Sequence, residues 1–238
     1  MLFRQLFDAE TATFTYLLAD EASREAVLID SVIEQLARDT QLIRELGLKV
    51  KYLIETHLHA DHITAVTRLK DAFPDAKSVY NAAAGVQGAD LLLLDGETLQ
   101  FGRHTLAALH TPGHTDACTS FLIDDRVFTG DALLIRSCGR TDFQQGDAGR
   151  LYDSITQKIF TLPDHTVVYP GHDYNGFTSS TVGEEKAFNP RFVGKSRAEF
   201  VALMNSLKFS YPKKIDVALP ANLKCGAIDG APLKRTTG

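Results

Sequence analysis

The sequence has no long apolar run and no block of basic residues, and each absence excludes a class of protein. No apolar run approaches the roughly 20 residues that an α-helix needs to cross a bilayer, so we expect no membrane segment. Residues 1–8 lack a basic region followed by a long apolar stretch, so we expect no secretory signal. The formal net charge is -5, which disfavours electrostatic binding to nucleic acid or anionic lipid.

Cysteine is also scarce. The three cysteines, Cys118, Cys138 and Cys225, are too few and too widely spaced for a disulfide framework or a zinc ribbon. A reducing cytoplasm is the simplest compartment for such a chain. The composition, 44% hydrophobic and 23% charged, is typical of a globular protein. The length of 238 residues suits one large domain or one and a half ordinary ones.

The pattern of apolar residues predicts a mixture of strands and helices. Strands are expected at 2–7, 13–19, 25–30, 50–55, 77–81, 91–94, 98–101, 104–110, 119–123, 126–129 and 166–169, and helices at 32–46, 63–73, 148–160, 179–188 and 196–207. Strands followed by a helix, loosely repeated in two halves, suggest two packed sheets with helices outside, although the pattern alone supports only α/β or α+β. We expect a single domain over 1–226, including C-terminal helices, and a flexible tail over 227–238.

The stretch from Thr56 to His62, Thr-His-Leu-His-Ala-Asp-His, carries three imidazoles and one carboxylate within six positions. Histidine is the commonest metal-donating side chain near neutral pH. The stretch lies where a predicted buried strand ends and a helix begins, which is where α/β sheets usually bind ligands. A solvated polar loop would explain such a cluster poorly, so we predict a metal site here.

Three further stretches place metal-donating side chains at the ends of predicted strands. They are His110-Thr-Pro-Gly-His114-Thr, Thr129-Gly-Asp131 and Pro170-Gly-His172-Asp173. Glycine or proline beside each donor suits a tight turn that directs a side chain into a shared pocket. Taken alone, a Gly-Asp after a strand is more often a plain turn, and a histidine near a proline is more often solvated. Four such stretches together favour one shared site.

The motifs THLHADH, HTPGHT, TGD and GHDY, in this order over residues 13 to 175, resemble those of the metallo-β-lactamase superfamily. The resemblance implies a four-layer αββα sandwich with a metal at one edge of its two sheets. Residues 132–146, 169–177, 188–191 and 220–226 resemble, more narrowly, the persulfide dioxygenases of the ethylmalonic-encephalopathy protein type, which are glutathione-dependent sulfur dioxygenases. No appended rhodanese domain is seen.

The narrower resemblance implies an enzyme of sulfide or persulfide catabolism that oxidises glutathione persulfide with O2 to sulfite and glutathione. It implies one Fe²⁺ per chain, held by His57, His114 and Asp131 as a two-histidine, one-carboxylate triad. Three protein ligands on one face of an octahedron leave positions where a sulfur substrate and O2 can bind side by side. The remaining donors then orient ligands and water through hydrogen bonds; they are His59, Asp61, His62 and His172.

The number of metal ions is left open by the donors themselves. Glyoxalase II, a hydrolase of the same superfamily, uses a similar set of seven donors for a binuclear centre. The alternative function is therefore a glyoxalase II-like hydroxyacylglutathione hydrolase, which needs no redox metal.

Glutathione carries two carboxylates, so its pocket should supply fixed cations, and the planar fork of arginine suits a carboxylate. Arg140 is the candidate, although it could equally be a surface residue or brace its loop through Asp142. Tyr174 stands where glyoxalase II has a glutathione-contacting tyrosine, with simple packing as the alternative. Two residues near the C-terminus could close the pocket, Asn222 and Lys224. A homodimer is the default for a soluble oligomer.

Overall fold

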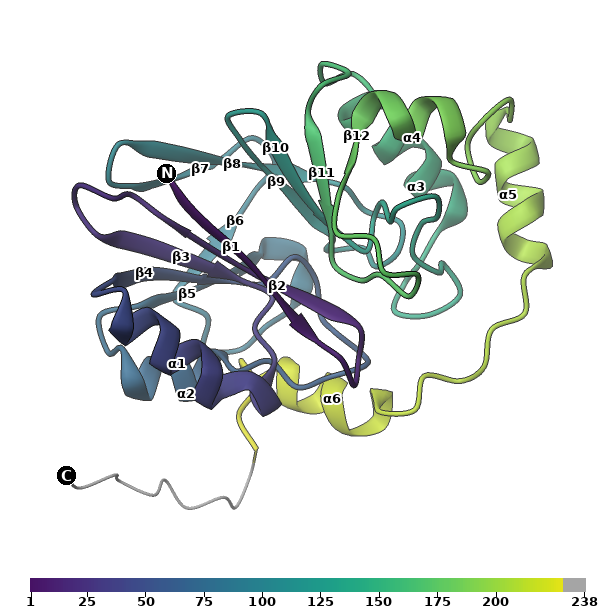
Figure 1. Cartoon of the computed structure of the whole chain (residues 1–238). Coiled ribbons are helices and arrows are strands. Elements are labelled where there is room, and N and C mark those ends of the chain that lie inside the picture. Colours follow the sequence, from purple (N-terminus) through teal and green to yellow (C-terminus); the bar gives the residue numbers. More distant parts are fainter. Residues whose placement is uncertain (229–238) are drawn as a thin grey trace.

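The computed structural model of the protein describes residues 1–228, which form two six-stranded sheets packed face to face (Figure 1). The strands of the first sheet follow chain order: β1 (Leu2–Asp8), β2 (Thr13–Ala19), β3 (Glu25–Ile29), β4 (Lys49–Ile54), β5 (Lys77–Asn81) and β6 (Leu91–Leu93). The second sheet is ordered β12-β11-β10-β9-β8-β7, from β7 (Thr98–Phe101), β8 (His104–His110), β9 (Thr119–Ile123), β10 (Arg126–Gly130), β11 (Val167–Pro170) and β12 (Ser180–Thr181).

The alternation of side chains along β2 shows why the sheets are buried on both faces. Tyr16 and Leu18 pack in the core between the sheets, whereas Leu17 and Ala19 pack in the core on the opposite face. Successive side chains of a strand point to opposite faces, so a strand with apolar residues on both faces needs a layer on each side. From the second sheet, Phe101, Phe121 and Phe128 fill the shared core.

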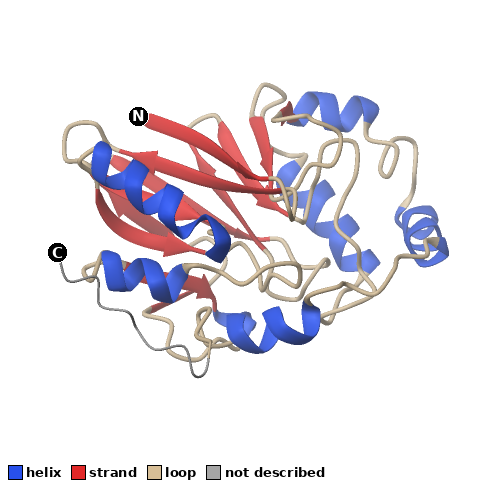
Figure 2. Ribbon diagram, turned by 60° about the horizontal axis from the view of Figure 1, so that its bottom comes forward, coloured by secondary structure: helices blue, strands red, loops and turns tan. Residues whose placement is uncertain are grey.

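Helices cover the two outer faces and complete the predicted αββα sandwich (Figure 2). The first sheet is covered by α1 (Leu36–Glu45), α2 (Val66–Ala72) and α6 (Ile215–Asn222), and the second by α3 (Ala148–Ser154), α4 (Val182–Phe188) and α5 (Arg197–Ser206). Short 3-10 segments lie at Ile33–Gln35 and Ala82–Ala84, and a π-helical turn, Ile155–Ile159, extends α3. None of the described helices is long and apolar enough to cross a membrane.

The predicted elements are largely present, and the differences have local causes. The helix after the donor stretch begins at Val66 rather than Ile63, because Thr64 forms a β-bridge with Val32. The helix expected over 179–188 begins only at Val182, since Ser180–Thr181 pairs with β11. Helix α6 was not predicted. The expected single domain over 1–226 and flexible tail over 227–238 stay predictions, because residues 229–238 lie outside the described part of the chain.

The ends of several strands meet at one edge of the sandwich. β3 and β4 run parallel in the first sheet, and β10 and β11 run parallel in the second, so the residues that follow them gather together. The backbone links the two sheets there, because the amide of Phe14 donates to the carbonyl of Gly171 at 2.8 Å and the amide of Thr119 donates to that of Thr56 at 2.8 Å. The predicted donor stretches all begin at this edge.

Candidate metal centre

Three of the seven predicted donors converge at this edge, each from a different segment. His57 follows β4, His114 follows β8, and Asp131 follows β10. One ligand atom from each side chain lies within 4.8 Å of the others, and His114 Nε2 lies 3.8 Å from Asp131 Oδ2. This spacing suits a single ion with two imidazole ligands and one carboxylate ligand.

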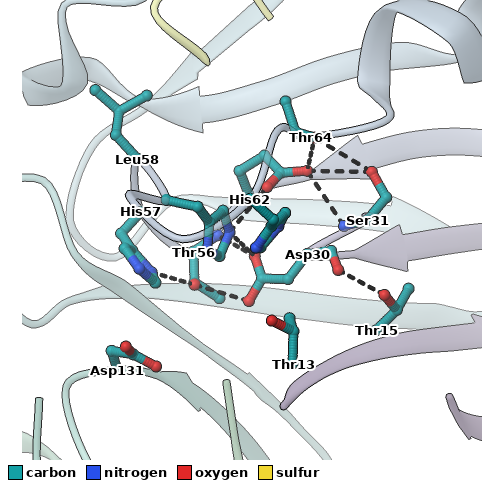
Figure 3. Close-up of polar contacts among 12 residues, drawn as sticks. Thr13, Thr15, Asp30, Ser31, Thr56, His57, Leu58, His62, Thr64 and Asp131 are labelled. Atoms are coloured by element: carbon teal, nitrogen blue, oxygen red, sulfur yellow. Dashed lines mark hydrogen bonds and ion pairs between the residues drawn. The ribbon is translucent and has the colours of Figure 1, made fainter. Parts of the chain in front are cut away.

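Hydrogen bonds leave one nitrogen of each imidazole free for a metal. His114 Nδ1 donates to the carbonyl of Arg140 at 2.7 Å, and a carbonyl can only accept, so Nε2 carries the lone pair. His57 Nδ1 lies 2.9 Å from the hydroxyl of Thr56, which again leaves Nε2 for a ligand (Figure 3). The donor set therefore fits a metal ion.

The charge states of two of these groups also suit metal binding. Burial lowers the pKa of His57 well below its usual value, and the neighbouring His59 lowers it further, so the imidazole is neutral. Burial alone would raise the pKa of Asp131, but His172 and His57 hold the pKa of this carboxyl below its usual value. The ligands are thus neutral or anionic as a metal requires.

The other four predicted donors lie beside the three converging ones and form hydrogen bonds and ion pairs. His172 donates through Nδ1 to Asp131 Oδ1 at 2.7 Å, and its Nε2 lies 3.1 Å from Asp61 Oδ2. Asp61 Oδ2 also lies 2.8 Å from His62 Nδ1. Burial would lower the pKa of His172, but the carboxylates of Asp131 and Asp61 raise it well above its usual value. A histidine that uses both nitrogens in this way orients Asp131.

His59 is turned toward two buried acids that sequence reasoning did not select. Its Nε2 lies 3.0 Å from Glu55 Oε2 and 3.3 Å from Asp30 Oδ1. Burial would lower the pKa of His59, but Asp30 and Glu55 raise it well above its usual value. Glu55, His59 and His62 form a second group whose ligand atoms lie within 4.8 Å. The available signal was an acidic residue at the end of each apolar strand, at positions 30 and 55.

A cavity of about 440 Å³ opens onto the three converging donors. Its remaining lining comes from the loop after Asp131, from the segment after β11 and from the chain before α6: Leu134, Ile135, Ser137, Cys138, Arg140, Phe143, Gln144, His172, Asp173, Tyr174, Asn175, Phe209 and Pro212, with Ala60 and Asp61 from the donor stretch. Burial raises the pKa of the Cys138 thiol to about 12, which suits a thiol that takes no part in the chemistry.

Arg140 and Tyr174, two predicted substrate contacts, both line this cavity. Arg140 also braces its loop, because it donates to both carboxylate oxygens of Asp142, at 2.7 and 2.8 Å, and to the carbonyl of Ser210 at 2.8 Å. The ring of Tyr174 stacks on His172 with 6.0 Å between centroids, and 72% of the residue is exposed.

Asn222 and Lys224 are not among the described residues that line the cavity. Asn222 lies behind the donor stretch and is 1% exposed. Its amide nitrogen donates to the carbonyls of His59 and His62 at 2.9 Å, and its oxygen accepts from the amide of Thr64 at 2.9 Å. Asn222 thus fixes the backbone of the donor stretch, while Lys224 lies in the turn after α6 and is exposed.

Comparisons with known proteins agree with this architecture. Residues 9–172 match the model of the metallo-beta-lactamase superfamily. The chain is 53% identical over 228 residues to the mitochondrial persulfide dioxygenase ETHE1 of Homo sapiens, covering 95% of this chain and 89% of that protein. The crystal structure of ETHE1 from Myxococcus xanthus has a TM-score of 0.93 and 52% identity, covering 95% of this chain and all of that one.

A more distant structure, TTHA1623 in a di-iron-bound form, has a TM-score of 0.64 and 27% identity, covering 79% of this chain and all of that one. Structures of this fold therefore include one that holds two irons. Two findings assign the chain to a family: the match over residues 9–172, and the identity of about half of all positions with ETHE1 proteins. It belongs to the metallo-beta-lactamase superfamily and, within it, to the family of the ETHE1 persulfide dioxygenases.

Proposed function

We propose that this protein is an iron-dependent persulfide dioxygenase that converts glutathione persulfide, O2 and water into glutathione, sulfite and two protons. The observation that carries the activity is the 53% identity over 95% of the chain to a persulfide dioxygenase. The convergence of His57, His114 and Asp131 supports the metal centre. In the overall change, the terminal sulfur is oxidised, O2 is reduced, and the sulfur–sulfur bond is cleaved.

We propose one Fe²⁺ per chain, held by His57 Nε2, His114 Nε2 and the Asp131 carboxylate. Two imidazoles and a carboxylate form the ligand set typical of non-haem Fe(II) oxygenases. When bound there, iron would bind the persulfide sulfur and O2 and would pass electrons between them. Zinc could not, because it has no accessible redox change.

Four neighbouring side chains keep these ligands in place rather than binding the metal, in our proposal. His172 holds one oxygen of Asp131 and is itself held by Asp61. Asp61 in turn pairs with His62. His59 pairs with Glu55 and Asp30 and so belongs to a separate buried group.

The substrate pocket is the cavity in front of the metal ligands. Arg140 has five N–H donors, and three of them already bind Asp142 and Ser210, so two are left for a substrate carboxylate. Phe143 and Phe209 flank the guanidinium at 4.6 and 5.0 Å from their ring centroids. Glutathione would lie between Arg140 and the exposed ring of Tyr174, with its persulfide toward His57.

The location and the oligomeric state of the protein belong to the same proposal. We propose a cytoplasmic location, since Cys118, Cys138 and Cys225 are all unpaired thiols. We propose a homodimer, because closed two-fold dimers are the commonest soluble oligomers. Light scattering of the purified protein measures its mass, and a monomer at micromolar concentration would remove the second proposal.

The alternative is a glyoxalase II-like hydrolase with a binuclear centre. It is favoured by the presence of all seven donors and by the two irons in the related TTHA1623 structure. An oxygen electrode separates the two functions. We expect O2 uptake that depends on glutathione persulfide, with sulfite released. Rapid cleavage of S-lactoylglutathione by an iron-loaded protein that takes up no O2 would establish the hydrolase instead.

A further inference from the structure

Asp30 is buried beneath the metal centre and is not one of its predicted ligands. It follows β3, is 1% exposed, and has a backbone φ of 54°, which is rare for a residue with a side chain. Its backbone is fixed on both sides, because its amide donates to the carbonyl of Ile54 at 2.9 Å and its carbonyl accepts from the hydroxyl of Thr15 at 2.7 Å. Such a constrained position points to a defined role for the carboxylate.

The carboxylate of Asp30 uses both oxygens to bind the donor stretch. Oδ1 accepts from the amide of Thr56 at 2.7 Å and lies 3.3 Å from His59 Nε2. Oδ2 accepts from the hydroxyl of Thr56 at 2.8 Å. Figure 3 shows this chain of contacts running from Asp30 through Thr56 to the imidazole of His57.

The direction of each hydrogen bond in this chain follows from the groups present. The hydroxyl of Thr56 has a single proton, and it donates this proton to Asp30 Oδ2 at 2.8 Å. The oxygen of Thr56 can then only accept from His57 Nδ1, at 2.9 Å. His57 must therefore carry its proton on Nδ1, and the lone pair on Nε2 is left for the metal.

Packing leaves Thr56 little freedom to change this arrangement. Thr56 is 2% exposed, and a Cβ added to Gly130 would lie 2.4 Å from its Oγ1. Gly130 immediately precedes Asp131, so the hydroxyl is enclosed by the strand end that supplies the carboxylate ligand. The oxygen of Thr56 therefore has no space to move toward Gly130, and no water fits between them.

We propose that Asp30 and Thr56 are positioning residues that select the Nδ1-protonated tautomer of His57 and so make its Nε2 a metal ligand. The carboxylate acts on the metal through the hydroxyl rather than directly. Metal-binding histidines usually donate their second nitrogen to such a partner, whose loss costs about 10–100-fold in metal affinity. This inference rests on the proposed metal site, but the tautomer can be measured without any metal.

The sharpest variant is Asp30→Asn, which keeps every heavy-atom position. The amide oxygen must take the place of Oδ1, because two donors, the Thr56 amide and His59, face it. The NH₂ group then faces the hydroxyl of Thr56 and donates to it. The hydroxyl proton turns to His57 Nδ1, which moves the proton of His57 to Nε2 and blocks the ligand atom. Asp30→Asn should thus reverse the direction of the hydrogen bonds from residue 30 to His57 rather than break them.

This reversal gives an unusual expected order of Fe²⁺ affinities. Thr56→Val removes the hydroxyl and leaves either tautomer possible, so we expect an affinity about tenfold weaker, and Asp30→Asn should be weaker by about 100-fold. Adding Thr56→Val to Asp30→Asn removes the reversed bond, so the double variant should bind Fe²⁺ more tightly than Asp30→Asn alone. A merely structural role for Asp30 would make the double variant the weakest.

Two matched controls separate the hydroxyl from general packing. Thr56→Ser keeps the hydroxyl, so its Fe²⁺ affinity should stay within about threefold of that of the native protein. This change is smaller than the loss of about 10–100-fold expected when the hydrogen-bond partner of a metal-binding histidine is removed. Thr111→Val makes the same substitution at a buried threonine whose hydroxyl pairs with that of Ser120 at 2.9 Å instead of with Asp30. It should leave Fe²⁺ affinity unchanged even if stability falls.

The deciding measurements are anaerobic Fe²⁺ competition titrations and nitrogen-15 NMR of the imidazoles in the metal-free protein, with His57 assigned by its loss in His57→Ala. We expect His57 protonated on Nδ1 in the native protein and on Nε2 in Asp30→Asn. The same tautomer in both, or equal affinity of Thr56→Val and Thr56→Ser, would overturn the inference. If Asp30→Asn fails to fold, the Thr56 pair decides alone. A native protein with the Nδ1 tautomer but no iron would refute the proposed function only.

Discussion

Residues 1–228 contain two groups of three metal-donating side chains, and only one of these groups is suited to hold a metal that meets a substrate. His57, His114 and Asp131 line a cavity, whereas Glu55, His59 and His62 are at most 2% exposed. The ligand atoms of each group lie within the same 4.8 Å. Proximity and residue type are therefore equal, and access to the cavity separates the two.

The second difference between the two groups is the position of their protons. In the first group, hydrogen bonds to Thr56 and to the carbonyl of Arg140 hold the imidazole protons on the nitrogens away from the centre. In the second group, a carboxylate faces an imidazole directly, because Glu55 Oε2 lies 3.0 Å from His59 Nε2. The first group thus presents free imidazole nitrogens to a cavity, whereas the second places a carboxylate against an imidazole in the protein interior.

The largest expected effect tests this distinction directly. His57→Ala, His114→Ala and Asp131→Ala should each remove iron, because each takes away one of three protein ligands. His59→Ala and His62→Ala should retain measurable iron and lose activity by about 10–100-fold, as expected for groups that act through other ligands. Metal analysis of the anaerobically purified variants measures this. If His59→Ala lost iron as completely as His57→Ala, the two groups would have to be treated as one centre.

The second prediction concerns stability rather than metal. Glu55→Leu leaves His59 without its closest carboxylate and removes the acceptor for the hydroxyls of Ser31 and Thr64, at 3.3 and 2.6 Å. Breaking a buried ion pair from one side costs about 3–5 kcal/mol, so the free energy of unfolding should fall by that amount. Urea unfolding of the metal-free protein measures it.

Ser31→Ala is the control for this change, since it removes only one hydroxyl from the same carboxylate. It should cost about 1 kcal/mol, the usual net contribution of one hydrogen bond. Iron content per folded chain should stay at the native value in both variants. A Glu55→Leu protein of native stability that has lost its iron would mean that the buried group belongs to the metal centre.

The third prediction concerns the hydrogen bonds by which Asn222 of α6 holds the donor stretch. Asn222→Ala removes the bonds to the carbonyls of His59 and His62 and to the amide of Thr64. Buried groups left without a partner cost about 1–3 kcal/mol, so stability should fall within that range. The substrate KM should stay near native, because Asn222 lies outside the cavity. A raised KM with native stability would return Asn222 to the substrate pocket.

Much of the fold could be predicted from the sequence, because apolar patterning reports burial directly. The strands predicted at 13–19 and 25–30 are rich in apolar residues, and both lie between layers. Helix α6 could not be found in this way. Its segment contains Pro220 and has no strong apolar face, and its position depends on bonds to residues about 160 positions earlier. Such contacts leave no local pattern.

The site also has residues that could be predicted from the sequence and residues that could not. Donor residues next to glycine and proline at strand ends are visible in the sequence, and His57, His114 and Asp131 do converge. The roles of Asp30 and Glu55 are not visible, because an acid at the end of a strand usually faces solvent. Only the structure shows both carboxylates buried against His59. The nitrogen of a histidine that carries the proton depends on the hydrogen-bond partners that the fold brings to the ring, and residue type alone does not reveal it.

The smallest expected effect lies at the mouth of the cavity, where a side chain serves both structure and substrate. Arg140 donates three N–H groups to Asp142 and Ser210, and two further N–H groups are left for a substrate carboxylate. A charge-assisted bond contributes roughly 1.5–3 kcal/mol, and competition from Asp142 places the effect at the lower end. Arg140→Ala should therefore lower kcat/KM for glutathione persulfide by about tenfold, mainly through KM, while iron stays bound.

Arg136→Ala is the matched control for Arg140→Ala, since Arg136 pairs with Glu184 and Glu185 and is not among the residues that line the cavity. It should lower stability and leave kcat/KM unchanged. Steady-state O2 uptake, with iron measured on the same samples, distinguishes the two arginines. If Arg140→Ala kept the native kcat/KM and lost stability as Arg136→Ala does, Arg140 would only brace its loop. The cavity would then recognise glutathione through other groups, with Tyr174 the first to test because its exposed ring stacks on His172.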